Sequence, residues 1–298
     1  MPAPTPLEEA PAPIGGSRPL FLKREDVHEL GAFKWRGALP ALAEYRSRGA
    51  DAVVTASTGN HGAASAWAAE RVGIRAVVFA PEGASAAKLA LLERLGAELH
   101  LVGADLDEAK ERGRAWAAER DLPFFEDGAE PAQFEGYAEI GRELLAQLGE
   151  QPARVVAPVG NGALLIGVAR AVGAAAVGVV AKEAPVMELS VAAGRPVECA
   201  QSATFADGMA VRVAVPLAVD ELVGLRVPMV SVSERAIARS VGAFAAAGIR
   251  VEGSAAAALA GHEALGPADG QTVLIVTGRN IEDDLHRRAV QDPESFPD

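Results

Sequence analysis

Cysteine is almost absent from this sequence of 298 residues. Cys199 is its single copy, so neither an internal disulfide nor a metal cage of several cysteines can form. Basic residues are also in deficit: 28 lysines and arginines against 40 acidic residues give a net charge of −12, which argues against nucleic acid or an anionic membrane as the main partner. Apolar runs such as residues 173–180 are far shorter than the roughly 20 residues of a membrane helix. No charged segment followed by an apolar one opens the chain, so we expect a cytoplasmic protein.

The remaining composition is that of a globular protein, with 50% apolar and 23% charged residues, and the length suggests two domains or one large α/β unit. Short apolar segments alternate with helical patterns of ten or more residues. This alternation predicts an α/β fold in which helices cover mostly parallel sheets. We expect strands at residues 19–25, 52–55, 75–80, 98–102, 154–159, 176–182, 228–231 and 272–277, and helices at residues 36–48, 62–72, 86–95, 106–120, 133–148, 164–172, 237–247 and 254–265.

Two parts of the chain have weaker patterns. Residues 1–18 contain five prolines, and we expect them to be loosely held. Residues 184–226 predict a helix and loops. Residues 126–131 interrupt the periodicity, which indicates a domain boundary. The predicted domains are residues 1–51 with 131–298, and residues 52–130.

Lys34 is a candidate nucleophile. It lies between two aromatic residues, Phe33 and Trp35, just before a predicted helix. A lysine among apolar neighbours has its charged form disfavoured, which frees the amine for Schiff-base chemistry. The alternative is a surface lysine whose stem alone is covered, which is the commoner situation because lysine is rarely buried.

Two loops between a strand and a helix are candidate anion sites. Residues 56–62 (ASTGNHG) would present backbone N–H groups at a helix N-terminus to a carboxylate, although their hydroxyls could equally cap the helix. Residues 158–164 (PVGNGAL) contain glycines that let backbone amides approach a phosphate, although a plain tight turn is possible. Glu183, about 20 residues further on, leaves a dinucleotide site open.

Thr277 follows the apolar residues 273–276, at the carboxyl end of a predicted parallel strand, where open α/β sheets bind ligands. Its hydroxyl could donate a hydrogen bond to a ring nitrogen or serve only in a turn.

The order and spacing of these segments resemble the fold type II family of pyridoxal-phosphate enzymes, most of all its threonine/serine dehydratase branch, which is related to serine racemase and threonine synthase. The resemblance covers nearly the whole chain. The family's Ser-Phe-Lys-x-Arg-Gly-Ala motif is similar to residues 32–38, its Ser-x-Gly-Asn-His motif to residues 57–61, and its glycine-rich phosphate loop to residues 160–164. Residues 206–211 and 251–255 look like two further family segments.

This resemblance implies a tryptophan synthase β-like fold, with two open, twisted, mostly parallel sheets flanked by helices, and pyridoxal 5'-phosphate as cofactor. It implies a large cofactor-binding domain (1–51 and 131–298), a small substrate-closing domain (52–130) and a homodimer. Lys34 would form the Schiff base with the cofactor. The substrate carboxylate would be bound by Ser57, Thr58, Gly59 and His61, and the cofactor by Phe33, Asn60, Gly160, Asn161, Gly162, Ala163, Leu164 and Thr277.

Several residues depart from the family pattern. Asn161 and Ala163 replace glycines, which tightens the phosphate loop, and Thr277 stands where dehydratases usually have serine. Glu183 matches the first of two acidic residues that bind a cation in some relatives, but Leu189 falls near the expected aspartate, so we predict no metal site. The chain stops soon after these segments, and we expect no C-terminal effector domain.

Together these features predict elimination of water from a 3-hydroxy amino acid, L-threonine or L-serine, which gives a 2-oxo acid and ammonia. The freed Lys34 amine would remove the α-proton. The neutral hydroxyl of Thr277 would leave the cofactor's ring nitrogen largely unprotonated. Alternatives on the same fold are threonine synthase-like β- or γ-replacement and amino-acid racemisation. Alternatives of another class are a dinucleotide-dependent oxidoreductase and a non-catalytic ligand-binding protein.

Overall fold

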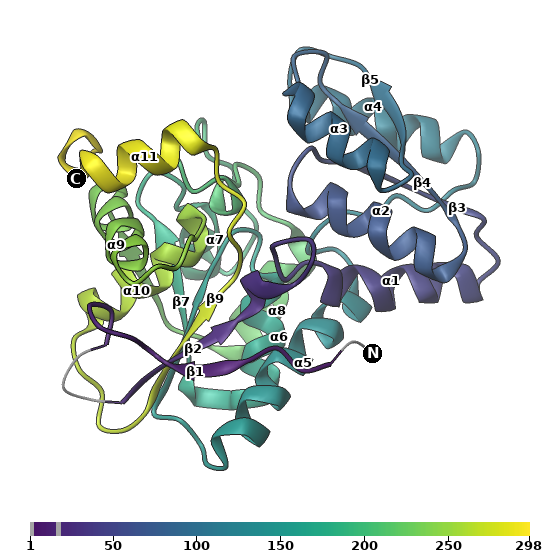
Figure 1. Ribbon diagram of the computed structural model, residues 1–298. Coiled ribbons are helices and arrows are strands. Elements are labelled where there is room, and N and C mark those ends of the chain that lie inside the picture. The colour runs from purple at the N-terminus through teal and green to yellow at the C-terminus, as the bar shows by residue number, and fades with distance from the viewer. Residues whose placement is uncertain (1–2, 16–18) are drawn as a thin grey trace. The chain divides into compact units, whose positions relative to one another are not determined.

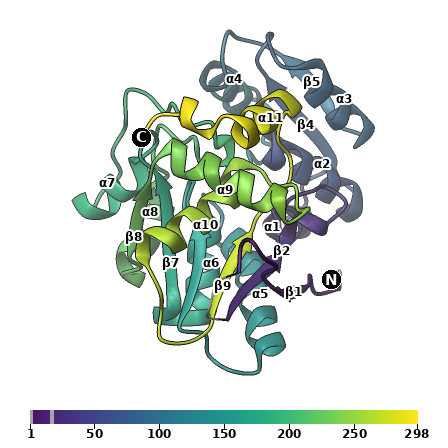
Figure 2. The same cartoon turned by 60° about the vertical axis from the view of Figure 1, so that its left-hand side comes forward.

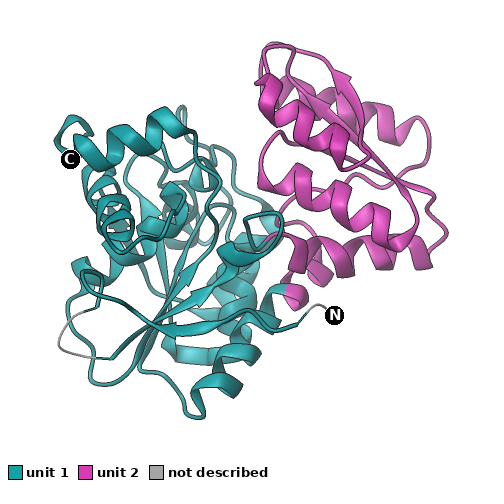
Figure 3. Ribbon diagram, viewed as in Figure 1, with its two compact units in different colours: residues 1–33, 137–298 teal, residues 34–136 magenta. Residues whose placement is uncertain are grey.

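The computed structural model describes residues 3–15 and 19–298. Contacts between residues divide the chain into two compact units, which Figure 3 shows in two colours. Unit 1 comprises Met1–Phe33 and Tyr137–Asp298, and unit 2 comprises Lys34–Gly136. Each unit is built on a parallel or mostly parallel sheet flanked by helices, which confirms the predicted fold class.

Unit 1 contains a six-stranded sheet (Figure 1). From one edge to the other, its strands are β1 (Leu7–Glu9), β2 (Leu20–Arg24), β9 (Thr272–Val276), β6 (Arg154–Pro158), β7 (Ala176–Ala181) and β8 (Met229–Val232). Only the first pair, β1 and β2, is antiparallel, and every other neighbouring pair is parallel. The carboxyl ends of β9, β6 and β7 therefore meet at one edge, where the loops that follow them can bind a ligand.

Both faces of the unit 1 sheet are covered by helices. A Cβ added to Gly178 would touch Leu165 of α6 (Ala163–Val172), whereas the next residue, Val179, contacts Gly261 of α10 (Gly253–Leu265). Because consecutive strand residues point to opposite faces, α6 and α10 lie on opposite sides of the sheet. Figure 2 shows α9 (Glu234–Ala246) beside α10. The remaining helices are α5 (Pro131–Leu148), which runs across the boundary between the units, α7 (Val186–Ala193), α8 (Pro216–Leu225) and α11 (Asp283–Gln291).

Unit 2 contains a three-stranded parallel sheet in the order β3 (Ala52–Ala56), β4 (Arg75–Ala80) and β5 (Glu98–Leu101). Alternate residues of β4 again pack on opposite sides. Val77 and Phe79 belong to a cluster with residues of α4 (Leu106–Ala118), whereas Val78 packs with residues of α2 (Asn60–Val72) and α3 (Ala86–Arg94). Burial of each such valine contributes about 1.5–3 kcal/mol.

The smaller unit is wider than the predicted domain of residues 52–130. Helix α1 (Trp35–Ser47) packs along α2 and so belongs to unit 2, together with the first residues of α5. The predicted functions of the two domains remain predictions.

Residues 3–15 are not loosely held, contrary to the expectation for residues 1–18, of which residues 1, 2 and 16–18 lie outside the described part of the chain. Strand β1 pairs with β2, and Lys23, which is fully buried, ties the segment to α5. Its Nζ donates to the carbonyl of Thr5 (2.7 Å), to Glu143 Oε2 (2.6 Å) and to Gln147 Oε1 (3.0 Å). These contacts satisfy a buried ammonium, which would otherwise be strongly destabilising. Among the helices of the described residues, none is long and apolar enough to cross a membrane.

Candidate active site

Lys34 lies where an extended segment becomes a helix. The backbone N–H of Phe33 donates to the carbonyl of Thr277 at 3.0 Å, and Ala32 forms an antiparallel bridge with Gly278. These contacts fix the residue that precedes Lys34 against the end of β9. Lys34 then begins α1 as its N-cap residue, and its side chain is only 14% exposed.

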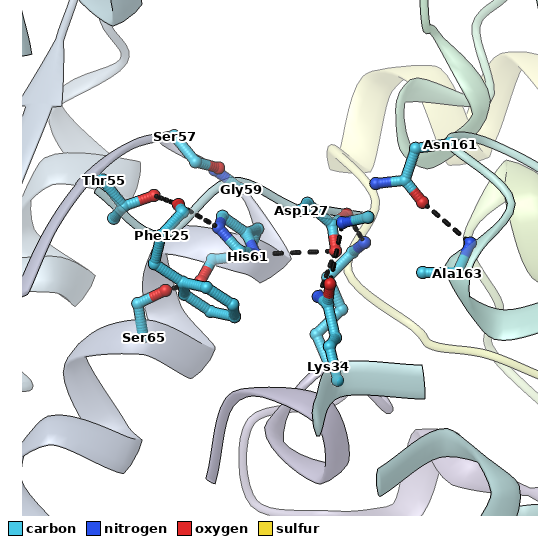
Figure 4. Close-up of polar contacts among 12 residues, drawn as sticks. Lys34, Thr55, Ser57, Gly59, His61, Ser65, Phe125, Asp127, Asn161 and Ala163 are labelled. Carbon is cyan, nitrogen blue, oxygen red and sulfur yellow. Dashed lines mark hydrogen bonds and ion pairs between the residues drawn. The ribbon is translucent and has the colours of Figure 1, made fainter. Parts of the chain in front are cut away.

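The ε-amine of Lys34 forms an ion pair with the carboxylate of Asp127 (Figure 4). Trp35 and Phe33 are buried, as expected, but a carboxylate partner was not foreseen from the sequence. Residues 126–131 indicated only a domain boundary, and the two partners are 93 residues apart in the chain. A buried lysine that is paired in this way is held in one orientation, which a surface lysine is not.

The fold places Asp127 through a short extension of the unit 2 sheet. Val54 of β3 donates its N–H to the carbonyl of Pro123 at 2.9 Å and accepts the N–H of Phe125 at 2.7 Å. Gln133, which is fully buried, then holds the loop: its Oε1 accepts the N–H of Gly128 at 2.7 Å, and its Nε2 donates to Asp127 Oδ1. The carboxylate that faces Lys34 is therefore held by both backbone and side chain.

His61, at the start of α2, is the third ionisable group in this cluster. Its Nε2 is 3.2 Å from the carbonyl of Phe125, and its Nδ1 is 3.7 Å from Asp127 Oδ1. Burial lowers the pKa of His61, the neighbouring Lys34 lowers it further, and Asp127 opposes this shift. Because a carbonyl only accepts, Nε2 of the neutral ring carries the proton and Nδ1 faces Asp127 with a lone pair.

The loop before α2 is tightly turned. Ser57 Oγ accepts the N–H of Gly59 at 3.2 Å, and a Cβ on Gly62 would lie 2.2 Å from the carbonyl oxygen of Ser57. Gly59 is the N-cap of α2, and no side chain caps this helix. The N–H groups of its first turn, which includes Asn60, are therefore suited to binding an anion. Thr58 is half-buried in the same loop.

The glycine-rich loop of unit 1 lies between β6 and α6. Gly162 is the N-cap of α6 at φ 94°, a conformation that favours glycine, and a Cβ on Gly160 would lie 2.4 Å from the carbonyl oxygen of Gly208. Asn161 Oδ1 accepts the N–H of Ala163 at 3.1 Å, so its side chain caps the helix that it precedes (Figure 4). Leu164 continues the first turn of α6 and is buried.

Two further buried hydroxyl groups of unit 1, those of Ser254 and Thr277, are candidates for the site. A Cβ on Gly208 would lie 2.6 Å from Ser254 Oγ, which is buried and has no hydrogen-bond partner. Thr277, at the end of β9, donates its hydroxyl to Glu252 Oε1 at 3.0 Å. Motif similarity pointed to residues 251–255 but gave Glu252 no role.

The candidate residues thus fall into two groups. Unit 2 brings Lys34 and His61 together around Asp127, with the 57–60 loop leading into His61, whereas unit 1 carries Phe33, residues 160–164 and Thr277. Glu183 is exposed at the end of β7. Across the part of the chain that the structure describes, no three His, Cys, Asp or Glu side chains gather as a metal site would require. The absence of a metal remains a prediction.

Comparisons with known proteins match between 65% and 99% of this chain. The L-threonine ammonia-lyase of Geobacter sulfurreducens is 32% identical over 273 residues, which are 89% of this chain and 68% of that protein. The biosynthetic L-threonine dehydratase of Pasteurella multocida is 33% identical over 199 residues, which are 65% of this chain and 39% of that protein. The processed form of threonine deaminase isoform 2 from Solanum lycopersicum superposes with a TM-score of 0.90 at 27% identity, over 99% of this chain and 89% of that one. The family model described as "Pyridoxal-phosphate dependent enzyme" matches residues 2–278, and the chain therefore belongs to that family.

Proposed function

We propose that this protein eliminates water from a 3-hydroxy amino acid, L-threonine or L-serine, and releases a 2-oxo acid and ammonia. The observation that carries the proposal is the ε-amine of Lys34, which is largely buried and held by Asp127 at the start of α1. Relatives named as threonine ammonia-lyase and threonine dehydratase support the choice of reaction.

The residues of unit 1 fit the phosphate of pyridoxal phosphate. The glycines at positions 160, 162 and 208 each leave room that a Cβ would fill, which opens the backbone to a close approach. The N-terminus of α6 favours an anion, and the buried hydroxyl of Ser254 has no hydrogen-bond partner within the protein, so it can donate to a phosphate oxygen. We propose that residues 160–164 hold the phosphate, and that Phe33, Asn60 and Thr277 contact the ring.

When bound, pyridoxal phosphate withdraws electrons from the substrate's α-carbon. Lys34 Nζ would hold the cofactor through its aldehyde, and the neutral amine would accept the substrate's α-proton. Asp127 orients Nζ through the ion pair, and Gln133 keeps that carboxylate in place.

The loop that precedes α2 binds the substrate carboxylate in this proposal. Ser57, Thr58 and Gly59 offer hydroxyl and backbone donors beside the helix N-terminus. Burial lowers the pKa of His61, so the neutral ring adds no second cation beside Lys34.

A product assay tests this function. The purified protein, loaded with pyridoxal phosphate, is incubated with L-threonine or L-serine, and 2-oxobutanoate or pyruvate is measured together with ammonia. We expect equal amounts of 2-oxo acid and ammonia, and Lys34→Ala should abolish both. Formation of the D-amino acid without ammonia would show racemisation instead and would contradict the proposal.

We also propose that the protein works as a homodimer, as the family resemblance implies, and that it is located in the cytoplasm. Sedimentation equilibrium tests the first statement: a mass of one chain, 30.6 kDa, over the working range of concentration would contradict it.

A further inference from the structure

The segment that leads into Lys34 pairs with the residues that follow β9. Ala32 forms an antiparallel bridge with Gly278, and the backbone N–H of Arg279 donates to the carbonyl of Gly31 at 2.9 Å. Both segments belong to unit 1, which ends at the residue before Lys34. The backbone that precedes the lysine is therefore fixed in part by main-chain contacts, which do not depend on the identity of the side chains.

The side chain of Arg279 adds a contact that the main chain cannot make. The residue is half-buried, its Nη1 donates to the carbonyl of Asp26, and its Nη2 makes a longer contact of 3.4 Å with the carbonyl of His28. Asp26 lies in the 3-10 helix η1 (Glu25–Val27), and the last carbonyls of a helix have no partner inside it. One planar guanidinium, whose N–H donors form a fork, therefore serves two backbone carbonyls.

The turn that precedes the bridge is shaped to receive this side chain. It is closed by a hydrogen bond from the N–H of Gly31 to the carbonyl of His28 at 2.7 Å, and Gly31 has φ 67°, which favours glycine. A Cβ on Gly31 would lie 2.6 Å from Asn280 Oδ1 and 3.3 Å from Arg279 Cγ, so the glycine lets both side chains cross the turn. Asn280 Nδ2 donates to the carbonyl of Leu30 at 2.8 Å. Two consecutive side chains thus hold one short turn.

We propose that Arg279 is a positioning residue for Lys34, because its guanidinium holds the backbone segment from which the ε-amine extends. The guanidinium is always charged, and a hydrogen bond from a charged donor is about twice as strong as one between neutral groups. A displacement of about 1 Å in a reacting group can lower a rate about 100-fold. This inference rests on the proposed function, in which Lys34 Nζ is the reacting group.

The test compares Arg279→Ala with Arg154→Ala, the matched control. Arg154 is the first residue of β6 and pairs with the first residue of β9, so it lies at the opposite end of the sheet from Arg279. Its Nη1 also donates to a backbone carbonyl, that of Gly266, at 2.7 Å. The two substitutions therefore remove the same kind of contact at two different places in unit 1.

Steady-state kinetics with L-threonine is the first readout. We expect kcat of Arg279→Ala to fall about 10-fold, because the contacts of the main chain and of Asn280 remain, and KM to change by less than about threefold. Arg154→Ala should keep both values. Arg279→Lys retains one charged donor and should recover part of the lost kcat. A merely structural role of Arg279 would lower the midpoint of urea unfolding and leave kcat at the wild-type value.

Hydrogen–deuterium exchange is the second readout and needs no turnover. The peptide that contains residues 28–33 should exchange about 10-fold faster in Arg279→Ala than in the wild type, because the turn opens more often without the guanidinium. The same peptide should exchange at the wild-type rate in Arg154→Ala.

The outcomes separate this inference from the proposed function. If the wild type releases 2-oxo acid and ammonia but Arg279→Ala keeps the wild-type kcat, or its 28–33 peptide exchanges at the wild-type rate, the role of Arg279 is wrong and the proposed function stands. If the wild type releases neither product, both fail.

Discussion

Replacement of Gly160 by alanine should lower the affinity for pyridoxal phosphate, because the new side chain would displace the loop that we assign to the phosphate. The new Cβ would lie 2.4 Å from the carbonyl oxygen of Gly208, whereas an ordinary contact is 3.4–4 Å. The loop or its neighbour must therefore move by about 1 Å, which removes attractive contacts at van der Waals distance. Overpacking of this kind costs about 1–3 kcal/mol. If binding requires the loop in its present form, this cost corresponds to an affinity about 5- to 150-fold lower.

Titration of the apoprotein with pyridoxal phosphate measures the change in affinity. Urea unfolding with and without cofactor gives a second measure, because binding stabilises the folded protein more when the affinity is higher. Gly242→Ala is the matched control. Gly242 lies inside α9, and a Cβ there meets no atom within 4 Å. Alanine at this position should raise stability by about 0.5–1 kcal/mol and leave cofactor affinity within about twofold. A Gly160→Ala protein with wild-type affinity would refute the assignment of this loop to the phosphate.

Three further substitutions test other parts of the account. Gly62→Ala should destabilise the protein by about 1–3 kcal/mol in urea unfolding, because its Cβ would lie 2.2 Å from the carbonyl oxygen of Ser57. Gly59 lies in the same loop with open space around it, so Gly59→Ala should cost less than about 0.5 kcal/mol. Equal costs for the two variants would contradict the loop geometry. Asp127→Asn should lower kcat about 10- to 100-fold with little change in KM, because Lys34 Nζ loses the carboxylate that orients it, and an unchanged kcat would exclude that role. Burial raises the pKa of Glu234 above its unfolded value of 4.5, so the wild type should lose stability as pH rises from that value through the folded pKa, whereas Glu234→Gln lacks this loss. The free energy of unfolding of both proteins is measured at pH 5 and pH 8, and we expect the variant to gain relative to the wild type at pH 8. A difference in unfolding free energy that is the same at both pH values would contradict the shift.

Sequence patterns predicted the buried strands and the long helices well. The strand predicted at residues 75–80 is β4 (Arg75–Ala80), because five of its six residues are buried and the apolar run has clear ends. Helix α11 was not predicted: only three of its nine residues are apolar, namely Leu285, Ala289 and Val290, which is too short a pattern to mark a helix in a sequence. Strand β1 has three residues and is defined by backbone pairing with β2, for which side chains give no signal.

The candidate site was predicted as a set of motifs and not as a set of contacts. Residues around Lys34, His61 and Thr277 were identified because each follows or begins an element with a recognisable pattern. Their carboxylate partners could not be found in this way. Asp127 reaches Lys34 because residues 123–125 pair with β3, and Glu252 reaches Thr277 because α10 begins beside the end of β9. Both contacts arise from pairing between distant segments, which no local pattern encodes.

The attachment of the cofactor to Lys34 is the central claim, and reduction of the loaded protein with borohydride followed by peptide mapping tests it most directly. The chain has five lysines, namely Lys23, Lys34, Lys88, Lys110 and Lys182, so the assignment is unambiguous. The account predicts a single pyridoxyl group on the peptide that contains Lys34, and none on that of the Lys34→Ala protein. A pyridoxyl group on another lysine of the wild type, or on none, would contradict it.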